Sequence, residues 1–208
     1  MDEKMESLIE EALRKYSQDE YYQTLITARE RYFHLTGATF DDDDDFEGRM
    51  NSFNYWYLFE YIPQNKTRTM IRDCIIKKGP NSEEENSLLG VQFSLFEYLG
   101  KNLRDMMTLK DIWTQKKTVL SATQSALPLV KNDYFIGRYI TFMGKNNLLP
   151  GYCLLPIEVK PDIYNQLSSL KGKEDLYLKQ EFLLKLEFLK TKWKRYGHIN
   201  AKKLFTFA

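Results

Sequence analysis

The chain has 208 residues, of which 43% are apolar and 28% are charged, and its formal net charge is +1. This is the composition of an ordinary globular protein, long enough for one medium-sized domain or two small ones. It excludes a membrane-spanning helix, because no apolar run approaches the roughly 18 residues that such a helix needs.

Two further features concern the compartment of the protein. The amino-terminal sequence MDEKMESLIEEAL is acidic, whereas a signal peptide begins with basic residues. Cys74 and Cys153 lie far apart without the spacing of a metal site, and they fit buried thiols in a reducing compartment. We therefore expect a cytoplasmic protein.

The small net charge conceals a gradient along the chain. Residues 1–63 carry 6 basic and 15 acidic groups, whereas residues 160–208 carry 11 basic and 5 acidic groups. A basic tail of this kind can bind nucleic acid or another anionic surface. Alternatively, the two oppositely charged ends dock on each other, or they lie on different solvated faces.

The first 90 residues are predicted to be mainly helical. Apolar side chains recur at steps of three and four in four segments, and Gly37, Pro63 and Gly79 follow the last three of them. A capping box at Ser82–Glu85 predicts a fifth, short helix that ends near Gly90. The four predicted helical segments are residues 5–16, 21–35, 46–62 and 67–78.

The third segment is among the most aromatic parts of the chain, and it directly follows the run Asp41–Asp45. We expect its second half to be buried on most sides. Aspartates at this position can cap the helix and interact with the positive end of its dipole. The alternative is a Ca²⁺ or Mg²⁺ site, although the spacing of an EF-hand is absent. The apolar side of this helix is expected to consist of Phe46, Met50, Phe53, Trp56 and Tyr57.

Residues 91–157 consist of short segments rich in β-branched and aromatic residues, with turn residues between or beside them. Five such segments predict a small, curled antiparallel sheet or barrel. Residues 160–170 and 178–196 return to helical spacing. The five predicted strands lie in VQFSLFEYL, MMTLKDIW, KTVLSA, FIGRYITFM and YCLLPIE.

These elements predict the fold class α+β. About four N-terminal helices and a long C-terminal helix would form a helical layer around the small sheet. Because the chain has no low-complexity linker, we expect one domain over residues 1–208. Its parts would be a helical part over residues 1–90, a β unit over 91–159 and a C-terminal helical part over 160–208.

No motif in the sequence identifies an active site. The chain lacks a nucleophile elbow, a phosphate-binding P-loop, a dinucleotide-binding glycine pattern and a zinc-protease motif. His34 and His198 lie at opposite ends of the chain and are expected to be solvated or half-buried. The carboxylates of Asp105 and Asp111 are interpreted as loop and strand-surface charges. We therefore predict no enzyme activity, no cofactor and no bound metal.

Several stretches resemble uncharacterised proteins of deltaproteobacteria, including myxobacteria and Bdellovibrio-like predatory bacteria. The resemblance covers most of residues 25–163 and is most specific at the acidic run before the aromatic helix. It implies a bacterial cytoplasmic protein with a shared fold, and it carries no catalytic residues. The stretches are LITARERYFHLTG, FDDDDDFEGRMNSFNYWYLFEY, QFSLFEY, LKDIWTQKK, LVKNDYFIGRYITF and CLLPIEVKPDI.

A second, shorter resemblance concerns nucleotide binding. Arg68 and Arg72 match RxxxR, and the stretch Glu85–Gly90 nearly matches [DN]xSxxG, so together they look like the cyclic-di-GMP motifs of PilZ domains. Two arginines one helical turn apart could hold phosphates or stack on guanine. The sequence departs from the pattern at Glu85, and both elements lie in predicted helices.

The favoured hypothesis is a non-enzymatic protein that binds another protein in a regulatory or scaffolding role. The alternative is a nucleic-acid or nucleotide binding protein with a basic surface beside a small β unit. The apolar end LFTFA is expected to pack on its own chain or on a second copy, so a homo-oligomer is a further alternative. The candidate residues for binding a polyanion are Arg68, Arg72, Lys190, Lys194, Arg195, Lys202 and Lys203.

Overall fold

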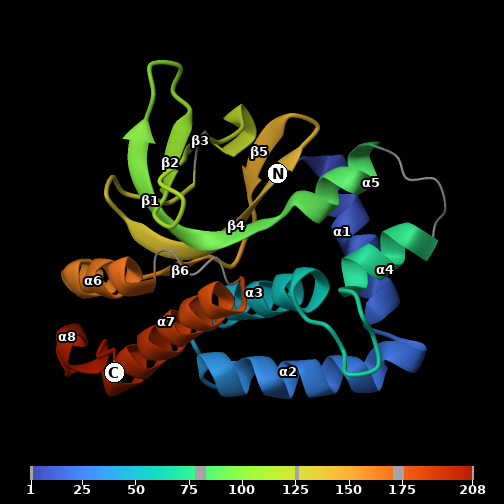
Figure 1. Cartoon of the computed structure of the whole chain (residues 1–208), viewed down its shortest axis with the longest axis horizontal. Helices are drawn as coiled ribbons and strands as arrows, with labels where there is room; N and C mark the ends of the chain where they lie inside the picture. The colour runs from blue at the N-terminus through green and yellow to red at the C-terminus, as the bar shows by residue number, and fades with distance from the viewer. Residues whose placement is uncertain (1, 78–82, 125–126, 171–175, 208) are drawn as a thin grey trace.

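The computed structural model describes residues 2–77, 83–124, 127–170 and 176–207. The chain has the predicted α+β fold, in which helices surround a curled antiparallel sheet (Figure 1). Short 3-10 turns join several of the elements. The described α-helices are α1 (Glu3–Tyr16), α2 (Tyr22–Thr36), α3 (Phe46–Phe59), α4 (Met70–Lys77), α5 (Glu83–Ser87), α6 (Lys160–Leu170), α7 (Leu176–Tyr196) and α8 (Ala201–Leu204).

The helical predictions agree with the structure except at several boundaries. Helix α3 ends at Phe59, four residues before Pro63, and α4 begins at Met70 rather than at Thr67. The predicted cap Ser82 and the predicted helix end at residues 78–80 lie outside the described residues. Helix α8 was not predicted, because four residues carry too little periodicity to indicate a helix.

The second half of α3 is buried on all sides, as its aromatic composition predicted. Every residue from Tyr55 to Phe59 is buried, whereas Phe46 and Met50 near the start are partly buried. The prediction that an aspartate side chain caps this helix was wrong for Asp45, whose carboxylate makes no capping hydrogen bond. That carboxylate instead accepts hydrogen bonds from Lys190 and Lys194 of α7, which lie far away in the sequence.

The sheet has the strand order β3-β2-β1-β4-β5, and the short β6 also pairs with β4. All its pairings are antiparallel. Strand β5 was not predicted, because its polar sequence KNNL has low strand propensity. It pairs with β4 through a two-residue turn at Met143 and Gly144, both with positive φ. The strands are β1 (Gln92–Lys101), β2 (Met107–Asp111), β3 (Lys117–Val119), β4 (Tyr134–Phe142), β5 (Lys145–Leu148) and β6 (Cys153–Leu154).

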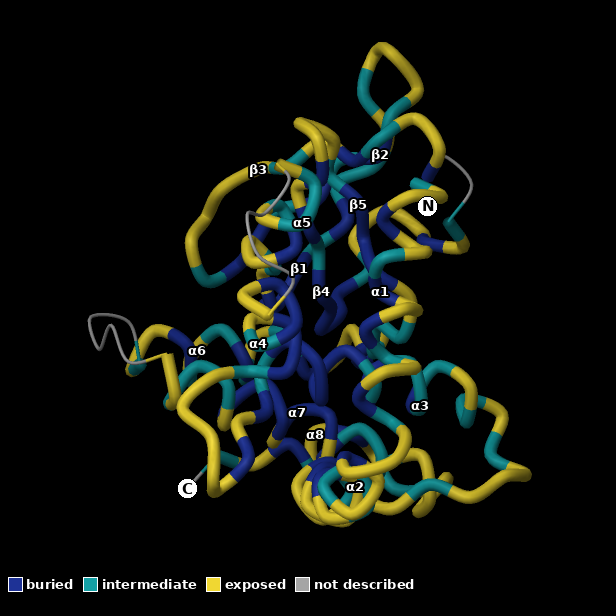
Figure 2. The backbone as a smooth tube through the Cα atoms, turned by 90° about the vertical axis from the view of Figure 1, so that its right-hand side faces the viewer, coloured by how far each residue is buried: buried dark blue, intermediate teal, exposed yellow. Residues whose placement is uncertain are grey.

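The sheet separates two hydrophobic clusters, because successive side chains of a strand point to opposite faces. Leu95 of β1 belongs to the main core beneath the sheet, and its neighbour Phe96 belongs to a smaller cluster inside the curl. The main core also contains side chains of α1, α3, α4, α6 and α7. Figure 1 shows α3 and α7 below the sheet with α2 beneath them, and Figure 2 shows the buried path through β1, β4 and α7.

The apolar end of the chain packs against the chain itself. Phe205 is buried, and the ring of Phe207 lies 5.8 Å from that of Phe182 of α7. Of the two arrangements expected for LFTFA, the structure therefore contains packing on the same chain.

The loop after β5 packs tightly on the backbone of α3 at Gly151. The φ angle of Gly151 is 80°. A Cβ atom on this residue would lie 2.5 Å from the backbone nitrogen of Ser52 and 2.7 Å from the carbonyl oxygen of Gly48. Gly144 has a similar φ of 74°, but a Cβ atom there would meet no atom within 4 Å. Substitution of Gly144 would therefore cause backbone strain alone, whereas substitution of Gly151 would cause backbone strain and steric overlap.

We expect Gly151→Ala to destabilise the protein more than Gly144→Ala does. The left-handed conformation should cost about 1–2 kcal/mol in either variant, whereas only Gly151→Ala also forces the loop away from α3. Urea denaturation measures the free energy of unfolding of each variant. Equal losses in the two variants would contradict the proposed close approach.

Candidate functional site

A buried ion pair joins the sheet to the end of α3. Arg138 of β4 forms a bidentate salt bridge with Glu60, with distances of 2.9 Å from Nε to Oε1 and 2.6 Å from Nη2 to Oε2. The two side chains are 2% and 5% exposed. The guanidinium also lies 4.0 Å from the ring centroid of Phe93. Because both partners are shielded from water, neither charge can lose the other without a large desolvation penalty.

Hydrogen bonds extend this pair to α2 and α7. Ser52 Oγ accepts a hydrogen bond from Arg138 Nη1 at 3.1 Å and lies 2.9 Å from the hydroxyl of Tyr32. The Tyr32 hydroxyl donates to Glu187 Oε2 at 2.7 Å. Burial raises the pKa of the Glu187 carboxyl, although Arg138 acts in the opposite direction. We call Tyr32, Ser52, Glu60, Arg138 and Glu187 the central polar cluster.

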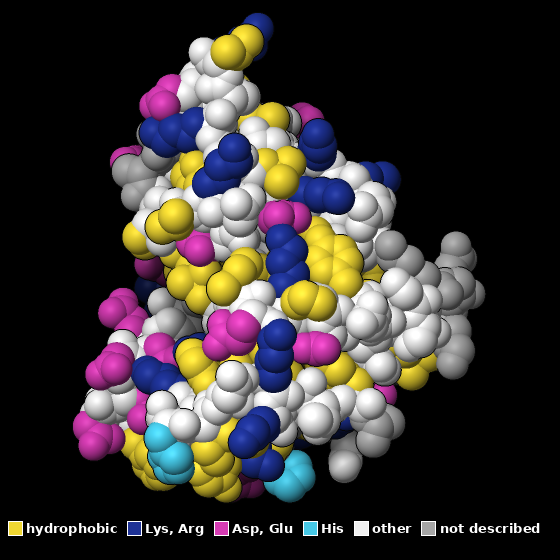
Figure 3. All heavy atoms as spheres, turned by 90° about the vertical axis from the view of Figure 1, so that its left-hand side faces the viewer, with side chains coloured by type: hydrophobic (Ala, Val, Ile, Leu, Met, Phe, Trp, Pro, Cys, Tyr) yellow, Lys and Arg dark blue, Asp and Glu magenta, His cyan; other side chains and the backbone are white. Residues whose placement is uncertain are grey.

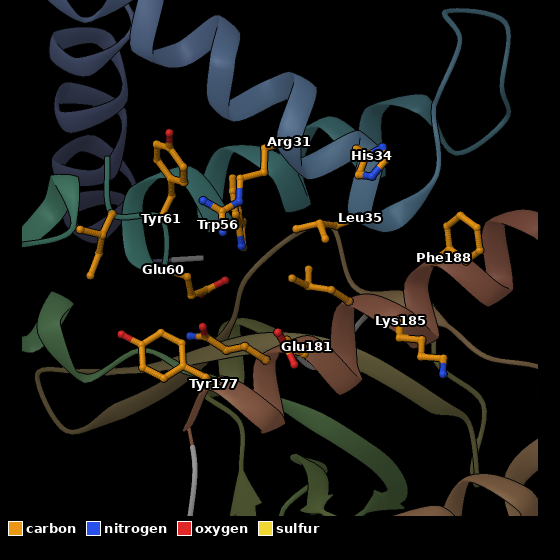
Figure 4. Close-up of a pocket in the computed structure, with 13 residues that line it drawn as sticks. Arg31, His34, Leu35, Trp56, Glu60, Tyr61, Tyr177, Glu181, Lys185 and Phe188 are labelled. Atoms are coloured by element: carbon orange, nitrogen blue, oxygen red, sulfur yellow. The ribbon is translucent and has the colours of Figure 1, made fainter. Parts of the chain in front are cut away.

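A cleft of about 680 Å³ opens beside this cluster, between α2, the end of α3 and the first half of α7. Figure 4 shows the side chains of α2 on one side, those of α7 on the other, and Glu60 extending from the end of α3 toward α7. We call it the α7 cleft. Its lining residues are Arg31, His34, Leu35, Trp56, Glu60, Tyr61, Ile62, Tyr177, Gln180, Glu181, Leu184, Lys185 and Phe188.

Several large apolar side chains that line the α7 cleft are exposed. Leu35, Ile62 and Phe188 are 38%, 40% and 37% exposed, and they line the same cavity. Charged side chains of both signs, including Arg31, Glu181 and Lys185, also line it. An exposed apolar surface bounded by charged groups is typical of a site that binds another molecule.

A second pocket, of about 380 Å³, adjoins the cleft and contains two of the predicted residues. Arg68 and Arg72 lie here together with Lys179 of α7, which the sequence did not indicate. Burial lowers the pKa of Lys179, and Asp111 partly offsets this effect. The two cavities share the lining residues Glu60, Ile62 and Gln180, so they are neighbours on the surface. We call this second cavity the arginine pocket.

Three other predicted cations are held by the segment around the acidic run. Lys190 and Lys194 of α7 form salt bridges of 3.0 Å and 2.9 Å with Asp45. Arg195 donates a hydrogen bond to the carbonyl oxygen of Ala38 at 2.6 Å and lies 4.8 Å from the ring of Phe40. The acidic segment therefore docks on the basic helix, which is one of the arrangements that the charge gradient allowed.

The remaining predicted cations lie apart from both cavities. Lys202 and Lys203 are exposed on α8. Figure 3 views the molecule from the side that carries α6 and α8, and there Lys and Arg side chains are interleaved with Asp and Glu. Arg138, a further arginine in the predicted strand FIGRYITFM, is not available on the surface either, because it is buried in the central polar cluster. The predicted cations therefore do not form one continuous surface in the described part of the chain.

The aromatic helix contributes mainly to the core rather than to a cavity. Phe53 and Tyr57 are buried in the main core, and of the predicted aromatic set Trp56 alone lines the α7 cleft. The cleft residues on α2 and α7, including His34, were not predicted as a site. No local motif marks them, because the cleft forms only where three segments distant in sequence meet.

Comparisons of the chain with protein-family models, with curated proteins and with solved structures found no significant match. None of the helices within residues 2–77, 83–124, 127–170 and 176–207 is long and apolar enough to cross a membrane. Among the same residues, no group of three or more His, Cys, Asp or Glu side chains is placed to hold a metal ion. The similarity to deltaproteobacterial proteins stays a prediction.

We expect Arg138→Met to lower the free energy of unfolding by about 3 kcal/mol or more, because Glu60 would stay buried without its counter-ion. Urea denaturation of Arg138→Met and of the double variant Arg138→Met with Glu60→Met tests this. The double variant should recover part of the loss. A single variant as stable as the parent chain would contradict the structural role of the ion pair.

The salt bridges of Asp45 predict a pH dependence of stability. Burial of the Asp45 carboxyl raises its pKa, but hydrogen bonds and charge interactions with Lys194 and Lys190 outweigh this and lower it to about 2. Because the pKa is lower in the folded than in the unfolded state, Asp45 stabilises the fold above about pH 4, and this contribution is lost as the pH falls toward 2.

Asp45→Asn should therefore lower the melting temperature at pH 7, and the difference from the parent chain should shrink as the pH falls from about 4 to about 2. Asp41→Asn is the matched control, because Asp41 is exposed and makes no described hydrogen bond or ion pair. Thermal melts at several pH values measure both variants. A constant difference for Asp45→Asn over this range would contradict the predicted pH dependence.

Proposed function

We propose that the protein binds an amphipathic segment of a partner protein in the α7 cleft, in a regulatory or scaffolding role. The observation that carries the proposal is the apolar lining of this cavity of about 680 Å³ on the surface. The partner's apolar side chains would cover Leu35, Ile62 and Phe188, and its charged side chains would meet Arg31, Glu181 and Lys185 at the rim. Burial of these exposed apolar side chains would supply most of the binding free energy.

The walls of the cleft are held in position before a partner binds. Helices α2 and α7 pack directly against each other, and the hydrogen bond between Tyr32 and Glu187 links them below the cleft. Glu60, at the end of α3, is held by Arg138. A partner that meets walls already fixed in position loses less conformational entropy on the protein's side. This rigidity supports a binding site rather than a surface that orders on contact.

The proposal is tested by site-specific photo-crosslinking in cells that express the chain naturally. A photo-reactive amino acid at position 188 should form a discrete crosslink to a partner protein that survives nuclease treatment. The same amino acid at Leu103, a fully exposed residue of the β1–β2 hairpin, should not form that crosslink. An absent crosslink at position 188, or equal crosslinking at position 103, would contradict the proposal.

A pair of isoleucine variants tests the same proposal by affinity. Ile62→Asp places a charge in the cleft and should reduce the crosslinked product about tenfold or more, because the carboxylate would lose its hydration on binding. Ile76→Asp is the matched control, since Ile76 is 48% exposed on α4 and lines neither cavity. Equal effects of both variants would contradict a role of the α7 cleft.

A further inference from the structure

The arginine pocket has a different chemistry from the α7 cleft that it adjoins. It lies between the start of α4, the segment that leads into β1, and the first turn of α7. Its three cations come from two distant parts of the chain, with Arg68 and Arg72 near the start of α4 and Lys179 on α7. Their meeting in one cavity is therefore a product of the tertiary fold and not of a basic run in the sequence.

The two arginines have no anionic partner within the described part of the chain. Both are exposed, and neither forms a described hydrogen bond or ion pair. Lys179 lies 5.8 Å from the ring centroid of Trp113. Asp111, whose charge raises the pKa of Lys179, already accepts hydrogen bonds from Ser94 and from two backbone N–H groups.

Among the described residues that line the pocket, Glu60 is the one carboxylate, and it does not neutralise these cations. Glu60 lines the pocket, but both of its oxygens accept hydrogen bonds from Arg138. Because that pair is buried and close to neutral, no carboxylate among the described lining residues is left to compensate the charges of Arg68, Arg72 and Lys179. An anion that enters would also face the start of α4, where the first helical N–H bond is that of Asp73 to the Thr69 carbonyl, so the helix dipole would attract it.

Part of the lining of the pocket is apolar. Ile62 is 40% exposed and Leu89 38% exposed, and both line the pocket together with Val91. The amide side chains of Gln92 and Gln180 add neutral hydrogen-bonding groups. The volume of about 380 Å³ lies at the lower end of the range for small-molecule sites. A ligand that fits this site has an anionic group at one end and a compact, partly apolar body at the other.

We infer that the arginine pocket binds a small phosphorylated ligand, such as a mononucleotide, with its phosphates held by Arg68, Arg72 and Lys179. The planar guanidinium groups can each hold two phosphate oxygens, and the lysine adds a point charge. The body of the ligand would lie against Ile62 and Leu89. This site is separate from the partner-binding site proposed for the α7 cleft, although the two share Glu60, Ile62 and Gln180.

Isothermal titration calorimetry of the full chain with inorganic pyrophosphate and with ADP tests the inference. Both probes should bind with one-to-one stoichiometry, and ADP should bind more tightly because its body contacts the apolar wall. The double variant Arg68→Gln with Arg72→Gln should bind both probes about tenfold or more weakly. Arg104→Gln is the matched control, because Arg104 is an exposed arginine of the β1–β2 hairpin outside both cavities.

Three results would overturn the inference. The first is no saturable binding of either probe by the parent chain at low ionic strength. The second is equal weakening by the Arg104→Gln control, which would indicate a diffuse charge effect. The third is that the double variant Arg68→Gln with Arg72→Gln binds ADP and pyrophosphate as tightly as the parent chain, which would place the binding outside the pocket. Because Arg68 and Arg72 are exposed, the double variant should keep the melting temperature of the parent chain, which the same samples can verify.

The titration and the crosslinking experiment test the two sites independently. Probe binding without a crosslink at position 188 would retain the phosphate site and reject the partner site. A crosslink without probe binding would do the reverse. The arginine variants leave Phe188 and Leu35 of the cleft unchanged, whereas Ile62 lines both cavities. The two sites are therefore told apart by the crosslink at position 188 and by the arginine variants, and not by Ile62→Asp.

Discussion

The buried salt bridge between Arg138 and Glu60 is the interaction on which the rest of the structure depends. It joins strand β4 to the end of α3, and Ser52, Tyr32 and Glu187 connect it to α2 and α7. A buried charge must keep its partner, so the sheet and three helices can pack together in few relative positions. The walls of both cavities begin at this cluster, because Glu60 belongs to each of them.

Charge compensation decides which cations remain available for a ligand. The basic end of α7 is occupied by Asp45 and by the backbone of Ala38, so Lys190, Lys194 and Arg195 stabilise the fold. The acidic segment and α7 also approach each other closely at Gly37, because the absence of a Cβ atom on this residue leaves room for the side chain of Thr191. Among the predicted cations, Arg68 and Arg72 lie in a cavity without a carboxylate partner in the described residues. The strongest basic run in the sequence is therefore not the strongest candidate for binding an anion.

The two cavities are neighbours on the surface and differ in their chemistry. The α7 cleft offers apolar surface with charges of both signs at its rim, which suits a protein segment. The arginine pocket concentrates positive charge, which suits phosphate. Since Glu60, Ile62 and Gln180 contribute to both, molecules bound at the two places would contact the same side chains. The central polar cluster lies directly behind this shared region and limits how far its backbone can move.

The sequence by itself determined the secondary structure wherever periodicity was strong. The helical spacing of α1, α2, α3 and α7 and the β-branched, aromatic segments of β1 and β4 follow from local side-chain geometry, so they could be predicted. Strand β5 could not, because its sequence KNNL takes its conformation from pairing with β4. Strand β4, which contains Gly137 and Arg138, was predicted as a strand, but nothing in the local sequence indicated that Arg138 would be buried against Glu60.

The tertiary structure alone decided the sites. Arg68 and Arg72 could be selected from their spacing, whereas Lys179 joined them because α7 passes the start of α4. The charge gradient left three arrangements open for the two ends, and the salt bridges of Asp45 selected docking between them. The physical reason is the same in each case. Local periodicity depends on neighbours three or four residues apart. Ion pairs and cavities depend on segments far apart in the sequence, such as Glu60 and Arg138, which are 78 residues apart, or Asp45 and Lys190, which are 145 residues apart.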